Sequence, residues 1–163
     1  MSEILTSIEA IYPELESSDF RGQTRIEVPS EQLMEVMQFL RGELGLEMLT
    51  DITCVDYLNY RKARHRFGMV YLLSETERVQ RLTVRVYLDP PDLTVSSVTS
   101  IWEGANWMER EVWDMFGIHF EGHPDLRRIL MPEEFAAHPL CKDYPLQGRG
   151  ERHNFPVLTR SQA

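Results

Sequence analysis

The stretch EREVWDMFGIHFEGHPDLRRIL, residues 109–130, combines more charge, aromatic area and turn chemistry than any other part of the chain. It overlaps a segment, residues 105–116, that contains neither proline nor glycine. Apolar side chains recur in this segment at helical spacing: Ala105, Met108, Val112, Met115 and Phe116. The spacing predicts an amphipathic helix over residues 105–116, with one apolar face.

The opposite side of this predicted helix is polar and is flanked by two tryptophans. At about 100° per residue, Asn106, Arg110 and Asp114 share one face, and Trp107 and Trp113 lie at its edges. An ion pair between Arg110 and Asp114, four residues apart, accounts for the charges of a solvated helix but not for the tryptophans. Half-buried core positions are one explanation for these. Because Trp and Arg are enriched at binding hot spots, we expect this face to contact another protein.

A helix end, a strand and a turn follow in quick succession. Gly117 is placed to end the helix in a left-handed conformation. Residues 118–121 alternate between apolar and polar side chains as a short strand does, and residues 122–124 turn the chain. Beyond the turn, Arg127 and Arg128 stand beside an apolar group of residues. Such a pairing suits docking onto acidic groups of a neighbouring protein.

The order of residues in this stretch resembles the signature of the C-subunit family, or 30 kDa subunit family, of NADH:quinone oxidoreductase, respiratory complex I. The matching positions are Glu109, Arg110, Glu111, Asp114, Met115, Phe116, His123, Arg127, Ile129 and Leu130. The resemblance continues backward over residues 105–107 and forward over residues 129–132, 142–146, 148–152 and 155–156, so it covers nearly the whole chain. One departure is Cys141, which stands where many members have Arg and which we expect to be a surface thiol.

The resemblance implies a structural subunit of the hydrophilic arm of proton-translocating NADH:quinone oxidoreductase, with no catalytic residue and no activity of its own. It implies that this chain binds no cofactor, and that FMN, iron–sulfur clusters and quinone belong to partner subunits. The expected partners are the large quinone-site subunit and other hydrophilic-arm subunits, on the cytoplasmic side of the inner membrane, where the chain is peripheral. The residues expected at the partner interface are Trp107, Glu109, Arg110, Glu111, Trp113, Asp114, His123, Arg127, Arg128, Lys142, Asp143 and Tyr144.

Two alternatives stay open at this point. The same motif resembles the homologous subunit of membrane-bound energy-converting hydrogenases and of other quinone-linked dehydrogenases. A function of a different class is an independent anionic binding or assembly module, in which the C-terminal segment folds back on its own domain.

Composition excludes several other classes of function. The net charge of −9 arises in residues 1–60, which carry 12 acidic residues against 3 arginines, and this disfavours nucleic acid and anionic lipid as partners. No apolar run approaches the ~20 residues of a transmembrane helix. Cys54 and Cys141 form no CxxC motif, and no glycine-rich nucleotide motif follows a predicted strand. Neither an iron–sulfur centre nor a nucleotide site is therefore expected.

The remaining segments predict an α+β fold. We expect helices over residues 3–11 and 30–45, the second with Ser30 as its N-cap, and a helical turn over residues 95–102. Strands are expected over residues 24–28, 47–57, 67–74 and 79–88, with the basic residues 61–66 at a hairpin tip and Cys54 in the core. The result is a mixed sheet of about four strands packed with helices, as one domain over residues 1–120.

The last 43 residues, 121–163, hold five of the nine prolines and no long helical pattern, yet they retain many apolar side chains. Long irregular segments are uncommon inside compact domains, and disordered segments are poorer in apolar residues. We therefore expect an extended C-terminal arm that wraps a partner subunit.

Catalytic and metal sites find little support. His119, Glu121 and His123 spell HxExH, but Gly122 and Pro124 interrupt the geometry and no further ligand pair is evident, so we expect no metal. Glu109 and Glu111 lie two apart on the predicted helix and point in different directions, which prevents them from sharing a substrate.

Overall fold

The computed structural model describes residues 3–76 and 80–151. Its main sheet has five strands in the order β1-β2-β5-β4-β3. These are β1 (Glu16–Phe20), β2 (Gln23–Glu27), β5 (Arg81–Leu88), β4 (Phe67–Ser74) and β3 (Met48–Asp56). β2 and β5 are parallel and the other neighbours are antiparallel, so the sheet is mixed.

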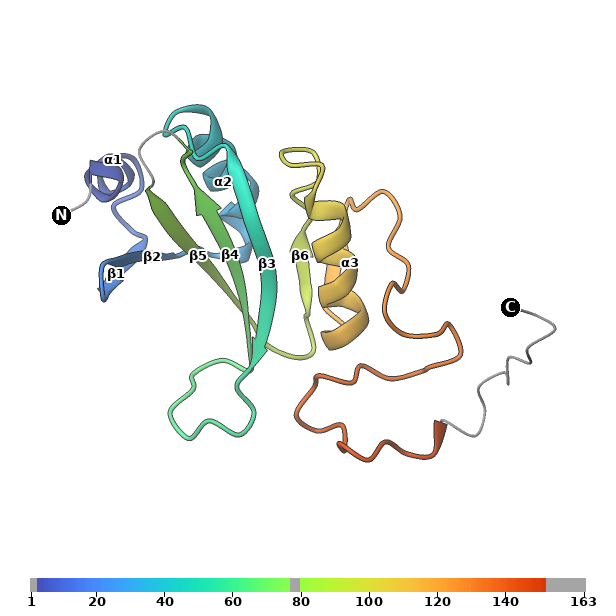
Figure 1. Ribbon diagram of the computed structural model, residues 1–163. Coiled ribbons are helices and arrows are strands. Elements are labelled where there is room, and N and C mark those ends of the chain that lie inside the picture. The colour runs from blue at the N-terminus through green and yellow to red at the C-terminus, as the bar shows by residue number, and fades with distance from the viewer. Residues whose placement is uncertain (1–2, 77–79, 152–163) are drawn as a thin grey trace.

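Three helices complete the fold: α1 (Glu3–Ile11), α2 (Leu33–Gly42) and α3 (Ala105–Phe116). A second, two-stranded parallel sheet joins β6 (Thr94–Ser96) to β7 (His119–Glu121). Figure 1 shows β6 and α3 beside β3, at the edge of the main sheet. The predicted α+β class and the mixed sheet are confirmed, although the sheet has one strand more than expected and the β6–β7 pair is additional.

Alternation of side chains explains the core. In β5, Leu82, Val84, Val86 and Leu88 are buried, whereas the residues between them are partly exposed. The apolar face of α2 is also fully buried: Leu33, Val36, Met37 and Leu40. One hydrophobic cluster joins these residues to α1 and to the inner face of α3. Cys54 lies in this cluster, as predicted.

Three local predictions need correction. Ser30 makes no capping bond, because a 3₁₀ turn (Ser30–Gln32) leads into α2, which begins only at Leu33. Val95 belongs to strand β6 and pairs with Phe120, so the turn of helical type starts at Val98, whose carbonyl accepts the N–H of Trp102. Strand β1 is absent from the prediction because all five of its residues are exposed, which leaves no alternation to detect.

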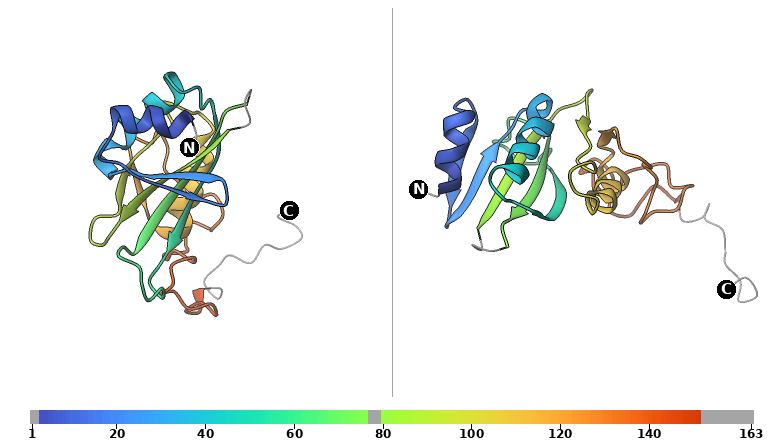
Figure 2. Two further views of the ribbon diagram at one scale, coloured as in Figure 1. Left: turned by 90° about the vertical axis from the view of Figure 1, so that its left-hand side faces the viewer. Right: turned by 90° about the horizontal axis from the view of Figure 1, so that it is seen from above.

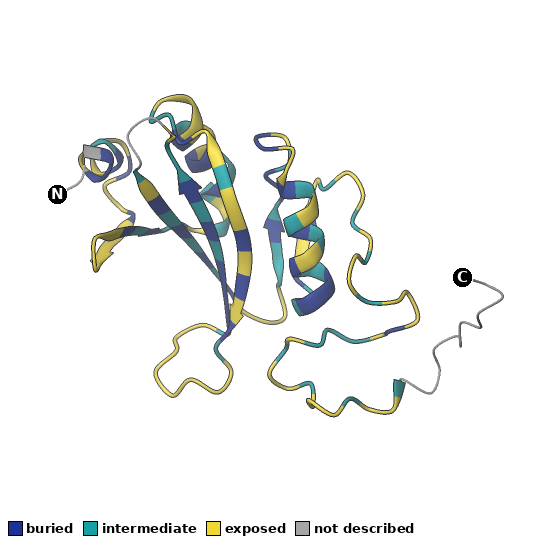
Figure 3. Ribbon diagram, viewed as in Figure 1, coloured by how far each residue is buried: buried dark blue, intermediate teal, exposed yellow. Residues whose placement is uncertain are grey.

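The arm follows β7, and its described part is residues 122–151. This part contains no further α-helix or strand. Figures 1 and 2 show it running along the side of α3 that faces away from the main sheet, and Figure 1 shows it then turning back below α3 toward the end of β3, where the N–H of Lys142 donates to Asp56. Most of its residues are exposed or partly exposed, whereas β4, β5 and the inward faces of the helices are largely buried (Figure 3). Wrapping of a partner by the arm stays a prediction.

Candidate functional site

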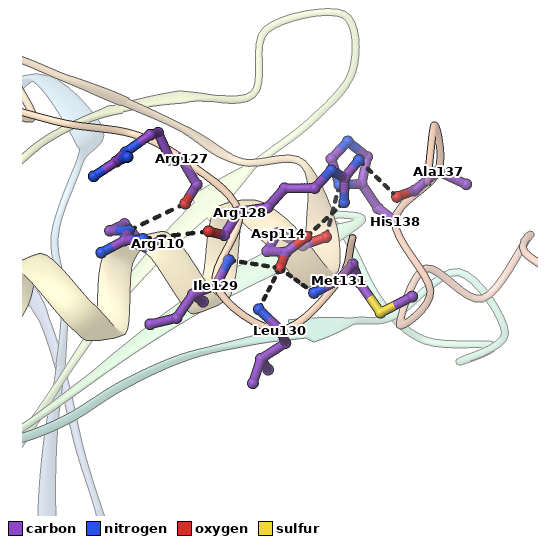
Figure 4. A network of polar contacts seen from close by, with 9 residues as sticks. All are labelled: Arg110, Asp114, Arg127, Arg128, Ile129, Leu130, Met131, Ala137 and His138. Atoms are coloured by element: carbon purple, nitrogen blue, oxygen red, sulfur yellow. Dashed lines mark hydrogen bonds and ion pairs between the residues drawn. The ribbon is translucent and has the colours of Figure 1, made fainter. Parts of the chain in front are cut away.

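The junction between α3 and the arm is organised around the carboxylate of Asp114, which is fully buried. Its Oδ2 atom accepts three backbone hydrogen bonds from consecutive residues of the arm, Ile129 at 3.0 Å, Leu130 at 2.8 Å and Met131 at 2.9 Å (Figure 4). Three N–H groups aimed at one oxygen form an anion-binding turn of the backbone. The carboxylate therefore determines the path of the arm across α3.

Arg128 completes this contact. Its guanidinium donates from Nη1 to Oδ1 of Asp114 and from Nη2 to the carbonyl of Ala137 at 3.1 Å (Figure 4). It also lies over the rings of Trp113 and Phe135, at 5.7 and 5.9 Å from their centres. Burial raises the pKa of Asp114, but the hydrogen bonds from the arm and from Arg128 outweigh burial and hold that pKa below its usual value.

Arg110 holds the same stretch of the arm from one turn earlier on α3. Its Nε donates to the carbonyl of Arg127 at 3.1 Å, and its Nη2 to the carbonyl of Arg128 at 3.2 Å (Figure 4). The guanidinium lies 5.1 Å from the centre of the Trp107 ring. Arg110 and Asp114 thus do not pair with each other, because each is engaged by the arm.

The end of α3 contributes a close backbone contact. Gly117 has the predicted left-handed conformation, with φ of 80°. A Cβ atom at this position would lie 2.8 Å from Cδ2 of His138, so the glycine also makes room for that ring. His138 Nδ1 in turn lies 3.0 Å from the carbonyl oxygen of Asp114, and its ring packs edge-on against Trp113.

A second anchor joins the arm to the hairpin tip. Asp56, buried at the end of β3, accepts the backbone N–H groups of Leu58 and Lys142. Arg66 donates to Asp143 at 2.7 Å and lies 3.6 Å from Asp56. Asp143 is exposed, so the Arg66–Asp143 pair contributes little stability, and the buried carboxylate of Asp56 is the stronger part of this anchor.

This anchor contains the one group that could hold a metal among the described residues: Asp56, Cys141 and Asp143. The guanidinium of Arg66 already contacts both carboxylates. Cys141 is half-buried, with its Sγ donating to the carbonyl of Phe116, and burial raises the pKa of its thiol to about 11. A protonated thiol and a resident cation do not suit a metal ion. Cys141, expected as a surface thiol, is thus partly buried in the structure.

The HxExH residues do not converge. His119 and Glu121 are exposed on β7. His123 has a fully buried side chain, and its Nε2 lies 3.2 Å from the carbonyl of Asn106. The strand thus exposes His119 and Glu121, whereas the turn after it buries the side chain of His123.

The structure separates the residues predicted at a partner interface into two groups. Trp107, Glu111, Arg127, Lys142 and Asp143 are exposed. The others pack within the chain: Glu109, Arg110, Trp113, Asp114, His123, Arg128 and Tyr144.

Glu109 and Asp114 need a correction, because both are fully buried and cannot face a partner. Glu109 bonds to the turn after β6, and Asp114 bonds to the arm. Several residues that hold the arm are absent from the predicted interface set, notably His138 at the junction with α3 and Asp56 at the second anchor. They meet their partners across 24 and 86 positions of sequence, which no local pattern encodes.

Comparison with known proteins agrees with this architecture. The family model described as respiratory-chain NADH dehydrogenase, 30 kDa subunit, matches residues 26–150. The chain belongs to this family. The matched residues include α3 and both places where the arm is held, at Asp114 and at Asp56.

Individual members of the family support the assignment. The C subunit of the NADH-quinone oxidoreductase of Trichlorobacter lovleyi is 47% identical over 83% of this chain and 83% of its own length. The corresponding protein of Moorella thermoacetica is 37% identical over 92% of this chain and 99% of its own length. Both relatives are named as subunits of an oxidoreductase.

Solved structures are similar as well. A trypsin-resistant fragment (1–134) of Nqo5 superposes with a TM-score of 0.70 and 37% identity, covering 76% of this chain and 96% of the fragment. A chain of the membrane-bound sulfane sulfur reductase, an archaeal respiratory membrane complex, gives a TM-score of 0.78 and 25% identity over 97% of this chain and 92% of its own. None of the helices in the described residues has the length and apolar content needed to cross a membrane.

Proposed function

We propose that this chain is the C subunit of an NADH-quinone oxidoreductase and has a structural role in it. The observation that carries the proposal is the 47% identity to such a protein over 83% of both chains. Electron transfer from NADH to quinone then proceeds through FMN and iron–sulfur centres held by other subunits, while this chain binds no cofactor and has no activity of its own. The polar groups buried at the α3–arm junction support this role, because they bond to the arm's backbone.

The proposed partner is the large quinone-site subunit, with other hydrophilic-arm subunits nearby, on the cytoplasmic side of the membrane. Large apolar side chains are exposed on α3 and along the arm: Trp107, Ile129, Leu130, Leu140 and Leu146. Trp107 is 61% exposed and Leu130 59%. Side chains of this kind commonly mark a surface that another protein covers. By fixing the arm across α3, Asp114 and Arg110 would present these side chains in one arrangement and so support the quinone site indirectly.

A tagged version of the chain, purified from its native membranes in mild detergent, tests the proposal. Mass spectrometry of the co-purifying proteins should identify flavin and iron–sulfur subunits, and the preparation should oxidise NADH with a quinone as acceptor. Recovery of the chain alone, folded and without that activity, would contradict the proposal and favour an independent binding module.

The docking surface is tested separately with Trp107→Ala and Arg127→Ala, two exposed positions beside the junction. Each substitution should reduce the amount of large subunit recovered with the tagged chain, while leaving the thermal unfolding of the isolated chain nearly unchanged. Phe20→Ala is the matched control, since Phe20 is 52% exposed but lies on β1, at the opposite edge of the main sheet from β3. Recovery by the two junction variants equal to that of the control would exclude this surface.

A second candidate function follows from the likeness to the sulfane sulfur reductase chain, which spans 97% of this chain. In that case the chain would be the homologous subunit of another membrane-bound respiratory complex, such as an energy-converting hydrogenase or a quinone-linked dehydrogenase. The same purification separates the two candidates, because the catalytic subunits that accompany the chain would differ.

A further inference from the structure

Glu109 lies at the middle of α3 and points into the protein, with no exposed surface. Its two oxygens are held by the turn that follows β6. Oε1 accepts the backbone N–H of Val98 at 2.7 Å, and Oε2 lies 2.7 Å from the hydroxyl of Ser97. A carboxyl group buried in this way costs free energy when it is ionised, unless a cation compensates its charge.

No lysine or arginine among the described residues forms an ion pair with this carboxyl. The nearest basic side chain is His123, whose Nε2 is 4.0 Å from Oε2. The backbone N–H of Asp125 donates to Nδ1 of His123 at 3.0 Å, and Nε2 of His123 lies 3.2 Å from the carbonyl of Asn106. Both ring nitrogens are therefore engaged by the backbone of the chain itself.

Two further buried titratable groups, Tyr71 and Cys54, are uncharged at neutral pH. Tyr71 of β4 is fully buried, and its hydroxyl has no hydrogen-bond partner within the described part of the chain. Burial, and then the charge of Glu109 and the nearby Cys54, raise the pKa of Tyr71 well above its usual value. Cys54 of β3 is buried as well, and burial raises the pKa of its thiol to about 12. Neither group can supply a positive charge.

A short chain of hydroxyl groups leads from Glu109 to Thr99, which is a partly exposed residue. The hydroxyl of Ser97 lies 2.8 Å from that of Thr99, and Ser97 Oγ also accepts the backbone N–H of Thr99. Ser97 is buried, whereas Thr99 is partly exposed. When Glu109 is ionised, Thr99 donates to Ser97 and Ser97 donates to Glu109. When Glu109 is protonated, it donates to Ser97, and Ser97 donates to Thr99, so both states satisfy the same three groups.

We propose that Glu109 is a buried proton-binding site, which exchanges its proton with solvent through the hydroxyls of Ser97 and Thr99. On uptake, a hydronium ion of the solvent gives a proton to the Thr99 oxygen and becomes water, the former Thr99 proton passes to Ser97, and the former Ser97 proton passes to Glu109. No other bond is made or broken. Burial raises the pKa of Glu109 to about 7, against the hydrogen bonds from Ser97 and Val98, which lower it. Half of the molecules would then hold this proton near neutral pH.

The site has a mechanical consequence, because it joins α3 to the turn after β6 and lies beside His123, at the start of the arm. The folded pKa of Glu109 is above its ordinary value of 4.5, so folding disfavours the ionised form. Stability should therefore fall as the pH rises from about 4.5 to about 7, and the contact between α3 and the turn after β6 should be most stable when Glu109 is protonated.

The first test is a titration of the purified chain by carbon-13 NMR, following the side-chain carboxyl carbons of glutamate from pH 4 to pH 9. One signal should titrate with a midpoint within a unit of 7, and it should be absent in Glu109→Gln. Glu111→Gln is the matched control, because Glu111 is exposed two residues further along α3, and it should leave that signal in place. A midpoint for Glu109 near 4.5 in the native chain would overturn the proposal, even if the variant does not fold.

Ser97→Ala tests the hydroxyl chain. The Ser97 hydroxyl stabilises the ionised carboxylate, so its removal should move the Glu109 midpoint upward. An unchanged midpoint would show that Ser97 is not part of the site. In addition, the thermal unfolding midpoint of the native chain should fall between pH 5 and pH 8, and Glu109→Gln should lack this part of the decrease. An equal decrease in both proteins would assign the pH effect to other groups.

Discussion

Arg128 of the arm donates a hydrogen bond to Asp114 of α3, and this ion pair is the centre of the contact between the two segments. The carboxylate is fully buried and the arginine side chain is 12% exposed, so the pair lies largely outside water. The second carboxylate oxygen is occupied by three backbone N–H groups of the arm. A buried pair of this kind is stable only where further hydrogen bonds support it, and here these are the three N–H groups on Asp114 and the Ala137 carbonyl that accepts from Arg128.

Asp114→Asn should destabilise the chain by about 3 kcal/mol, since the substitution leaves Arg128 as a largely buried charge without a counter-charge. The measurement is urea unfolding at pH 7. Asp125→Asn is the control, because Asp125 pairs with Arg127 at the surface and its loss should cost less than about 1 kcal/mol. Equal losses for the two variants would mean that the Asp114 pair is not buried in solution.

The same carboxylate should make the chain sensitive to acid. The folded pKa of Asp114 is lowered, so its contribution to stability is present above the unfolded value of 3.8 and is lost as the pH falls through the folded value. The native chain should therefore lose stability below about pH 4, and the loss should be smaller in Asp114→Asn. The measurement is the thermal unfolding midpoint of the native chain and of Asp114→Asn between pH 2.5 and pH 6. An equal decrease of the midpoint with falling pH in both proteins would contradict the prediction.

Gly117→Ala should destabilise the chain by about 2 kcal/mol or more. The left-handed backbone alone costs a residue with a side chain about 1–2 kcal/mol, and the new methyl group would also press on the His138 ring. Gly42→Ala, at the end of α2, is the opposite case, because no atom lies within 4 Å of a Cβ there and its φ is not positive. That variant should be as stable as the native chain or gain up to about 1 kcal/mol. Thermal unfolding of both variants provides the comparison.

Arg110→Lys should loosen the arm without unfolding the domain. The lysine has a single donor group in place of the planar fork that bonds to the carbonyls of Arg127 and Arg128, so we expect a loss of about 1 kcal/mol. Hydrogen exchange at the amides of residues 129–131 should become several-fold faster, while exchange in β4 stays the same. Arg61→Lys, in the exposed hairpin tip, controls for the substitution itself. Unchanged exchange in the arm would show that Arg110 does not hold it.

Predictions from local patterns succeed where one face of an element is buried. The apolar spacing of residues 105–116 matches α3 at both ends, and the alternation in residues 82–88 matches the buried face of β5. Strand β1 lacks any such face, and the pattern around Val95 indicates a helical turn although its strand is defined by pairing with Phe120. The spacing of apolar side chains predicts which residues are buried in the chain's own core. It does not predict strands that form only by pairing with a segment distant in sequence.

The polar residues of α3 mark the limit of what a pattern can predict. Their spacing identifies Arg110, Asp114 and the two tryptophans as an unusual face, and the order of residues is enough to indicate the family. The sequence pattern does not show what covers that face of α3, because solvent, the chain's own arm and another protein can each satisfy the same hydrogen-bond donors and acceptors. Tertiary structure places the arm on Asp114 and Arg110, buries Glu109 under the turn after β6, and leaves Trp107 exposed. Burial of a polar group depends on segments 11 to 17 positions away that complete its hydrogen bonds, and only the folded chain brings them together.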